Sequence, residues 1–319
     1  MQVERNAAEL IKAQALIEGF HKVGIARAEA LTSERRHLEA WLARGFNASM
    51  EWMARDIAKR TDPHHLLPDA KSIIVVALNY FTPHTHEEVR ENCETTFGKL
   101  SRYCWGDDYH DVIGSKLKSL LSWIKEEWPQ AEGKVCVDAQ PAMDKAWAVR
   151  AGFGWIGKHS NLITRDFGSW VFIGELILNL ELEPEPERVE DHCGSCTLCI
   201  DSCPTHAIID NRLIDAGKCI SYATIESRDE ELPSSVSEDL NGWLYGCDIC
   251  QEVCPWNRFE QPTNEARFEP RNGETSLPLE DVLNITHEEY TQRFRRSSVK
   301  RAKLSGLKRN ARALITTTF

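Results

Sequence analysis

The sequence predicts an α+β protein in which a larger mixed domain is followed by a small cysteine-rich module and a short helical tail. Two observations support this fold class. Helical and strand patterns alternate over residues 1 to about 185, and eight of the eleven cysteines fall between Cys193 and Cys254. A stretch of acidic and proline residues separates the two regions. We therefore expect three segments, which cover residues 1–185, 186–262 and 263–319.

The elements of the first segment follow from hydrophobic periodicity. Apolar residues recur at helical spacing over 7–19, which predicts an amphipathic helix. The apolar run SIIVVALNY at 72–80 predicts a buried strand. By the same criteria we expect helices at 109–128 and 141–151, the latter opened by its proline, a strand at 134–138, and one or two strands over 170–182. The stretch 181–191 is the expected linker, and the tail should hold a helix near 276–283 and a basic helical segment after it.

Composition places the chain among ordinary globular proteins. Hydrophobic residues make up 42% of the sequence and charged residues 27%, which excludes a disordered chain, a collagen or a coiled coil. No apolar stretch reaches the roughly 20 residues that a membrane helix needs. The N-terminus MQVERNAAEL shows no export signal. We therefore expect a cytoplasmic protein that does not contact a membrane.

The formal net charge of −11 argues against general nucleic-acid affinity, but the charge is unevenly distributed. Nine basic residues and no acidic residue lie between Arg293 and Arg312. This segment is either a solvated helix face or a local site for a polyanion, and the composition alone favours the solvated face.

The cysteine spacing is the most specific signal. Cys193-x2-Cys196-x2-Cys199-x3-Cys203-Pro is the run found in bacterial two-cluster ferredoxins. A second run, Cys247-x2-Cys250-x3-Cys254-Pro, lacks only the first cysteine, and Leu244 stands in that place. In a reducing compartment such density indicates metal or redox chemistry rather than disulfides.

The cross-ligation of such runs predicts two [4Fe–4S] clusters, because the fourth cysteine of each run binds the neighbouring cluster. A pair of four-cysteine zinc sites is the alternative, although zinc sites usually lack the third cysteine of the triplet and the trailing proline. Cys219 is the nearby cysteine that would complete the second set. The expected ligands are Cys193, Cys196, Cys199 and Cys254 for cluster 1, and Cys203, Cys219, Cys247 and Cys250 for cluster 2.

Electrons from such a module reach either a cofactor in the first segment or a partner protein. A flavin, a corrinoid or a docked protein are all consistent with the composition and spacing. The glycine-rich turn GFGWIGK at 152–158 matches neither a dinucleotide fingerprint nor a P-loop in the required context.

Five motifs together resemble the epoxyqueuosine reductase family, over about residues 53–311. They are VDAQPAMDKAWAVRAGFGWIGKHSNLI at 137–163, GSWVFIGELIL at 168–178, HCGSCTLCIDSCPTHAI at 192–208, KCISYATIE at 218–226 and YGCDICQEVCPWN at 245–257. The resemblance implies a nitroreductase-like cobalamin-binding domain, a ferredoxin-like module with two [4Fe–4S] clusters, and a kinship with reductive dehalogenases. The implied activity is the last step of queuosine formation, reduction of an epoxide on the wobble base of tRNA.

The resemblance also assigns roles. Asp138 in VDAQP matches the proton donor, which would neutralise the alkoxide formed when the epoxide carbon–oxygen bond breaks. For this role burial beside the corrinoid should raise the pKa of Asp138. The residues expected to contact cobalamin are Arg60, Asp138, Lys158, Ser221, Cys247 and Asp248. The implied reaction uses two electrons, from an unidentified low-potential donor, and two protons.

With a tRNA substrate, the basic segment becomes an expected phosphate contact. The expected tRNA-binding residues are Arg295, Arg296, Lys300, Arg301, Lys303, Lys308 and Arg309. Longer family members continue into a HEAT-like helical module, which we expect to be absent or truncated in this sequence, and we expect a monomer. A corrinoid reductive dehalogenase and a ferredoxin-type electron-transfer protein are the alternatives to a tRNA-modifying enzyme.

Overall fold

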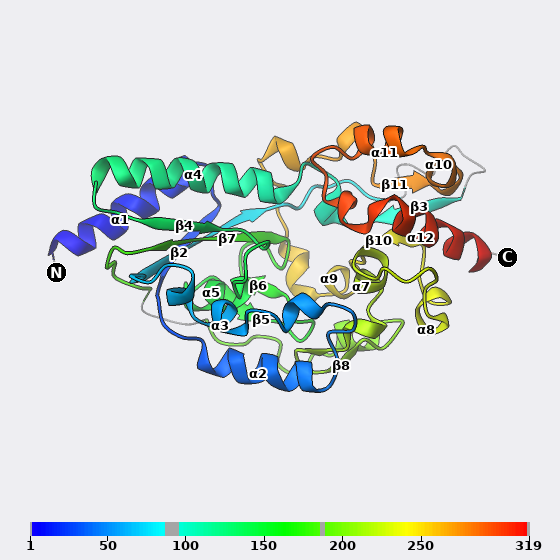
Figure 1. Cartoon of the computed structure of the whole chain (residues 1–319), viewed down its shortest axis with the longest axis horizontal. Coiled ribbons are helices and arrows are strands. Elements are labelled where there is room, and N and C mark those ends of the chain that lie inside the picture. The colour runs from blue at the N-terminus through cyan, green and yellow to red at the C-terminus, as the bar shows by residue number, and fades with distance from the viewer. Residues whose placement is uncertain (1, 87–95, 186–188, 318–319) are drawn as a thin grey trace.

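A four-stranded antiparallel sheet forms the centre of the first segment. The computed structural model describes residues 2–86, 96–185 and 189–317 (Figure 1). The sheet has the order β1-β2-β7-β4, and each neighbouring pair is antiparallel. Its strands are β1 (Lys22–Arg27), β2 (Ser72–Asn79), β7 (Val171–Leu178) and β4 (Gly133–Cys136). All eight residues of β2 are buried, because β2 is a central strand and helices cover both faces of the sheet.

Successive residues of β2 serve two different cores, because side chains alternate between the faces of a strand. Ile74 and Val76 pack against α1 (Gln2–Ile17) and α4 (Tyr109–Glu127) on one face. Ile73 and Val75 face the opposite core, which includes Trp147 of α5. The helices on this second side are α2 (Thr32–Ala43), α3 (Ile57–Thr61) and α5 (Asp144–Arg150), and the hairpin β5 (Gly154–Ile156) and β6 (Leu162–Thr164) lies on the same side (Figure 1).

The predicted helices and strands of this segment are confirmed, with several shifted ends. The first helix begins at Gln2 rather than at residue 7, and β7 ends at Leu178 rather than at residue 182. The strand predicted at 134–138 ends at Cys136, because the backbone turns at Asp138, where φ is +50°. The helix predicted from residue 141 begins only at Asp144. The residues between these ends form a loop, 137–143, that carries the predicted proton donor. The predicted linker at 181–191 and the boundary at 186 fall partly on 186–188, which lie outside the described residues.

The cysteine-rich module contains short elements joined by tight turns. Each cysteine run contains one helical turn, α6 in the first run and α9 in the second. Its elements are α6 (Leu198–Asp201), β8 (Ile208–Asp210), β9 (Leu213–Ile214), α7 (Ile220–Ile225), α8 (Ser234–Ser237), β10 (Trp243–Tyr245) and α9 (Ile249–Glu252).

The tail packs into the same core as the cysteine-rich module. A second sheet of order β10-β3-β11 takes one strand from each of the three predicted segments. Its further strands are β3 (Phe97–Leu100) and β11 (Ser276–Pro278), and the tail continues through α10 (Leu279–Asn284), α11 (His287–Arg293) and α12 (Lys303–Thr317). One hydrophobic core joins Trp105, Trp243 and Leu307. The predicted boundary at 262 therefore does not separate two cores.

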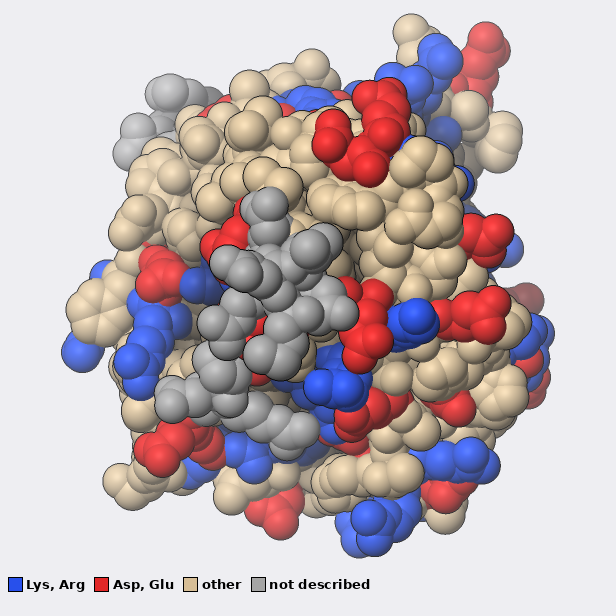
Figure 2. Space-filling view, turned by 90° about the vertical axis from the view of Figure 1, so that its left-hand side faces the viewer, with Lys and Arg blue, Asp and Glu red and all other residues tan. Residues whose placement is uncertain are grey.

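Charges of both signs are interspersed on the face at the α1 end of the molecule (Figure 2). Among the described residues, no helix combines the length and the apolar composition that a membrane crossing requires.

Candidate active site and cluster sites

Asp138 lies in a small hydrogen-bonded group at the N-terminus of α4. The Tyr109 hydroxyl donates to Asp138 Oδ2 at 2.5 Å, and His110 Nε2 lies 3.5 Å from the same oxygen. Asp108 is the N-cap residue of α4, and its Oδ1 accepts from the backbone N–H of His110 at 3.0 Å and pairs with His110 Nδ1 at 2.7 Å. Tyr109 stacks on Phe172 with ring centroids 4.4 Å apart, which fixes its hydroxyl.

This arrangement sets the charge of each member. Burial lowers the pKa of His110, but the hydrogen bonds to Asp108 and Asp138 outweigh it and raise the pKa to about 9. The imidazole is therefore protonated at neutral pH and donates from both nitrogens. Burial raises the pKa of Asp138, but hydrogen bonds from His110 and Tyr109 outweigh it, so the pKa is lowered. The predicted rise in the pKa of Asp138 is thus wrong for the protein alone, because two donors favour the carboxylate.

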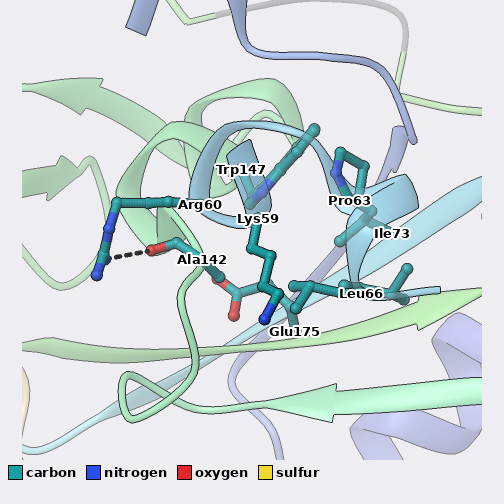
Figure 3. A pocket seen from close by; sticks show the side chains of 9 residues that line it. Lys59, Arg60, Pro63, Leu66, Ile73, Ala142, Trp147 and Glu175 are labelled. Carbon is teal, nitrogen blue, oxygen red and sulfur yellow. Dashed lines mark hydrogen bonds between the residues drawn. The ribbon is translucent and has the colours of Figure 1, made fainter. Parts of the chain in front are cut away.

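Arg60 and two further carboxyl groups lie on the α3–α5 side of the sheet. Arg60 of α3 donates from Nη1 to the carbonyl oxygen of Ala142 at 3.5 Å, next to a small cavity that Glu175 also lines (Figure 3). Both Asp138 and Asp144 raise the pKa of Arg60, although burial lowers it by more. The structure therefore places Arg60 and Asp138 in one electrostatic environment, as the sequence predicts for two residues of one site.

The four cysteines expected to bind cluster 1 line a single cavity between the hairpin β5–β6 and the cysteine loops. Three of them act electrostatically on Cys199, whose pKa burial raises to about 11. These neighbours of Cys199 are Cys254, Cys193 and Cys196.

The four cysteines expected to bind cluster 2 form a deeper group. Burial raises the pKa of Cys250, and Cys219 and Cys203 act on it as well. Cys219 and Cys250 also act on Cys247. The predicted addition of Cys219 to this set is supported by its position.

Backbone N–H groups point at several of the sulfurs, as they do around thiolates that hold iron. Ala207 N donates to Cys203 Sγ at 3.3 Å. Cys219 is the N-cap residue of α7; burial raises the pKa of its thiol, and the backbone of Tyr222 and Ser221 lowers it in part. Among the described residues no group of three or more His, Cys, Asp or Glu side chains could hold a single metal ion. The thiolates of a four-iron cluster bind different irons, so they stand further apart than the ligands of one ion.

Two residues predicted to contact cobalamin have other partners in the protein. Lys158 Nζ donates to the carbonyl oxygens of Gly194 and Cys196, both at 2.8 Å, and so braces the cluster 1 loop. Asp248 is buried, and its carboxylate accepts from Ser101 Oγ at 2.5 Å and from the backbone N–H of Arg102 at 2.7 Å. The side chains of Lys158 and Asp248 are therefore already hydrogen-bonded within the protein. Ser221 and Cys247 lie with the cluster 2 cysteines.

One predicted tRNA contact is wrong. Arg309 is 6% exposed, and its guanidinium donates to three backbone carbonyls, those of Ala223, Ser227 and Asp229. Asn310 beside it donates to Thr224 and Leu244, so this pair attaches α12 to α7 and β10. A buried arginine with its donors occupied has none free for a phosphate.

The remaining predicted tRNA contacts lie at the surface. Arg301 forms a two-pronged ion pair with Glu226 at 2.8 and 3.0 Å and lies over the ring of Trp52. Lys308 is half-buried. The exposed members of the predicted set are Arg295, Arg296, Lys300, Arg301 and Lys303.

Sequence reasoning missed the partners of the acid. Tyr109 and His110 stand directly after Asp108 at the start of a predicted helix, and a carboxylate that caps a helix is a recognisable signal. Glu175 was also detectable as the single charge inside an apolar strand run, WVFIGELILNL.

Two four-cysteine sets beside a carboxylate–imidazole group define an iron–sulfur oxidoreductase. The model of the 4Fe-4S double cluster binding domain matches residues 192–257, and that of the epoxyqueuosine reductase QueG family, DUF1730, matches residues 60–139. The epoxyqueuosine reductase of Synechocystis sp. is 47% identical over 87% of this chain and 94% of its own length. That of Cellulophaga algicola is 45% identical over 97% of this chain and 98% of its own. This chain belongs to the epoxyqueuosine reductase family.

A solved structure of the family has the same fold. The crystal structure of an epoxyqueuosine reductase with an epoxyqueuosine-modified tRNA-Tyr stem loop superposes with a TM-score of 0.90 and 32% sequence identity. The match covers 97% of this chain and 80% of the other. The predicted α+β fold class and the predicted family are thereby confirmed.

Proposed function

We propose that this protein reduces epoxyqueuosine at the wobble position of tRNA to queuosine, with cobalamin as its cofactor and Asp138 as its proton donor. The observation that carries the proposal is the position of Asp138. It lies on an exposed loop, hydrogen-bonded to a phenol and a protonated imidazole, in a family whose reaction consumes protons.

The residues present fit a large polar cofactor on the α3–α5 side of the sheet. Three buried polar atoms have no protein partner among the described residues: Arg60 Nε, His159 Nε2 and the Ser160 hydroxyl. Lys145 donates to the carbonyl oxygen of Ser160 at 2.9 Å, so these groups lie near one another and near Asp144. Such donors suit the amide groups that surround a corrin ring. We propose that Arg60 and the segment 158–160 hold cobalamin.

When bound, cobalamin supplies the strongly reducing metal centre that carbon–oxygen bond cleavage requires, and the clusters supply its electrons. The protein holds the proton. His110 keeps a proton 3.5 Å from Asp138 Oδ2, and Tyr109 orients the same oxygen. As negative charge develops on the departing epoxide oxygen, the proton shared by Asp138 and His110 moves to that oxygen. The exposed position of Asp138 allows contact with a base that enters from a single-stranded loop.

The substrate and further site assignments are part of the same proposal. The structural relative was solved with a modified tRNA stem loop, and this chain carries exposed cations at Lys300, Arg301 and Lys303. We propose that these residues contact the phosphates of the anticodon stem loop. The two four-cysteine sets are the proposed ligands of the two clusters.

The test is a product assay with Asp138→Asn. Reconstituted protein with cobalamin and a strong reductant is given tRNA that carries epoxyqueuosine, and the nucleosides are resolved by mass. Wild-type protein should yield queuosine in a cobalamin-dependent reaction, and Asp138→Asn should lower the rate by about 10²-fold or more. The matched control is Asp69→Asn, an exposed residue outside the site. Conversion by Asp138→Asn at the wild-type rate would refute the assignment of the acid.

A further inference from the structure

Glu175 is a buried charged residue that the proposed chemistry does not use. It lies in β7, paired with Val75 of β2 and Cys136 of β4, and is 1% exposed. Neither carboxylate oxygen of Glu175 has a hydrogen-bond partner that meets ordinary geometry among the described residues. Burying a charged carboxylate without partners costs several kcal/mol of folding free energy, so a glutamate inside a buried β-strand is expected to be protonated or to have a function.

The group that faces Glu175 from α5 is another carboxyl, Asp144. Asp144 Oδ1 also lacks a partner among the described residues. From α3, Arg60 and Lys59 line the same cavity as Glu175. However, Arg60 Nη1 donates to a backbone carbonyl, and Lys59 lies 3.6 Å from the carboxylate of Asp56. From β4, the Cys136 thiol is neutral, because burial and the nearby Glu175 raise its pKa.

The charges of Lys145 and Arg60 lower the pKa of Asp144, but among the described residues neither forms an ion pair with Asp144 or Glu175. Two carboxyl groups buried together without such a pair cannot both be charged, so one of them holds a proton. Burial raises the pKa of Asp144 and of Glu175, and the charge of Asp144 raises the pKa of Glu175 further. After burial, the largest effect on Asp144 comes from the charge of Asp138. The pair is therefore electrostatically connected to the proposed proton donor.

We propose that Asp144 and Glu175 share one proton and form a buried proton store that recharges Asp138 during the reaction. This inference rests on the proposed function. Reduction of the epoxide to an alkene consumes two electrons and two protons, and the oxygen leaves as water. A reduced low-potential protein, or dithionite in the assay, supplies the electrons. Asp138 and His110 supply one proton, and the second comes from the store.

The transfer is a proton movement between oxygen atoms. The O–H bond of the protonated carboxyl breaks, a new O–H bond forms on the Asp138 carboxylate, and the store is recharged from water after product release. The loop 137–143 joins Asp138 to Asp144 directly. The cavity beside Glu175 and Arg60 has room for about one water molecule, which can carry the proton along this side of the loop.

The test uses Glu175→Gln and Asp144→Asn, which keep the shape of a neutral carboxyl but hold no transferable proton. The matched control is Glu132→Gln, an exposed residue just before the same β4 strand that contacts Glu175. Infrared difference spectra of the cluster-loaded protein, recorded between pH 5 and pH 9, report protonated buried carboxyl groups directly. Single-turnover rates of epoxyqueuosine reduction, measured over the same pH range, report the proton supply.

We expect a carboxylic acid band in wild-type protein at neutral pH that Glu175→Gln or Asp144→Asn removes and Glu132→Gln keeps. We expect each site variant to slow the single turnover at least tenfold at pH 8, with an altered pH profile and an unchanged Kd for tRNA. If Glu175→Gln does not accumulate as folded protein, Asp144→Asn provides the same test.

The failures are distinguishable. Wild-type protein that lacks the acid band at neutral pH would refute the shared proton, whatever its activity. Site variants that lose the band but keep the wild-type rate and pH profile would refute the relay. Wild-type protein that has the band but converts no epoxyqueuosine would overturn the proposed function, and the relay with it, while leaving the shared proton established.

Discussion

His110 controls the proton on Asp138, so His110→Gln should change the pH dependence of the reaction. In the resting protein Asp138 accepts from Tyr109 and His110, and both interactions lower its pKa. Glutamine can still donate a hydrogen bond to Asp108 but carries no charge. The substitution therefore removes the positive charge that stands 3.5 Å from Asp138 Oδ2.

The size of the effect follows from that distance. Two unit charges 3.5 Å apart attract by about 1.2 kcal/mol in a medium like water, which corresponds to about one pKa unit. The water-like limit is appropriate because the Asp138 side chain is 60% exposed. A proton donor must be protonated in the free enzyme, so kcat/KM falls as the pH rises through its pKa. Without the imidazolium this pKa is higher, and the fall should move to higher pH by about one unit.

The assay is the pH dependence of kcat/KM for epoxyqueuosine tRNA between pH 3 and pH 7, because the pKa of Asp138 is lowered from the ordinary carboxyl value. His64→Gln is the matched control, because His64 pairs with Asp62 in the same local geometry, at 2.7 Å, with no contact to Asp138 among the described residues. The control should leave the profile unchanged. If His110→Gln moves the fall to lower pH, His110 itself is the donor that limits the rate, and the reasoning about Asp138 is refuted.

Three further substitutions test the contacts around the site. Arg309→Met removes the hydrogen bonds of a buried guanidinium to three backbone carbonyls and should cost about 3 kcal/mol of unfolding free energy in denaturant titrations. Lys308→Met, the control, should cost little. If Arg309→Met is as stable as the wild-type protein, the structural role is refuted and Arg309 is again a candidate tRNA contact. Lys158→Met removes two hydrogen bonds to the cluster 1 loop and should speed the loss of cluster absorbance with a chelator by about tenfold; an unchanged rate would contradict the bracing role. Replacing Lys300 and Lys303 together by alanine should raise the KM for tRNA. The slope of log KM against log salt concentration should fall by the amount expected for roughly two phosphate contacts, and an unchanged slope would exclude both lysines from the interface.

The grouping of the cysteines into two sets was predictable because cluster chemistry fixes the spacing of its ligands. Thiolates two residues apart meet in one tight turn, so Cys193, Cys196 and Cys199 could be assigned without knowledge of the fold. The buried strand at 72–80 was equally clear, since its eight central residues are all apolar or small and all are buried. Signals of this kind are local.

The acid's environment could not be predicted because it depends on contacts between distant segments. Tyr109 and His110 reach Asp138 only because α4 begins close to the place where β4 ends. From sequence, burial alone was expected to set the pKa of Asp138, and that gave the wrong direction. Arg309 was misassigned for a related reason: a basic residue in a basic run looks exposed until the packing of α12 on α7 is known.

The basic segment is therefore not one uniform cationic surface. The fold uses Arg309 to attach α12 and pairs Arg293 with Glu274 at 2.5 Å, so neither is available as a free charge. Arg301 is held by Glu226 and Trp52, which restricts its position without burying it, and its hydrogen bond with Glu226 raises its pKa. We therefore expect the turn around Arg301, rather than the length of α12, to position the tRNA loop over Asp138.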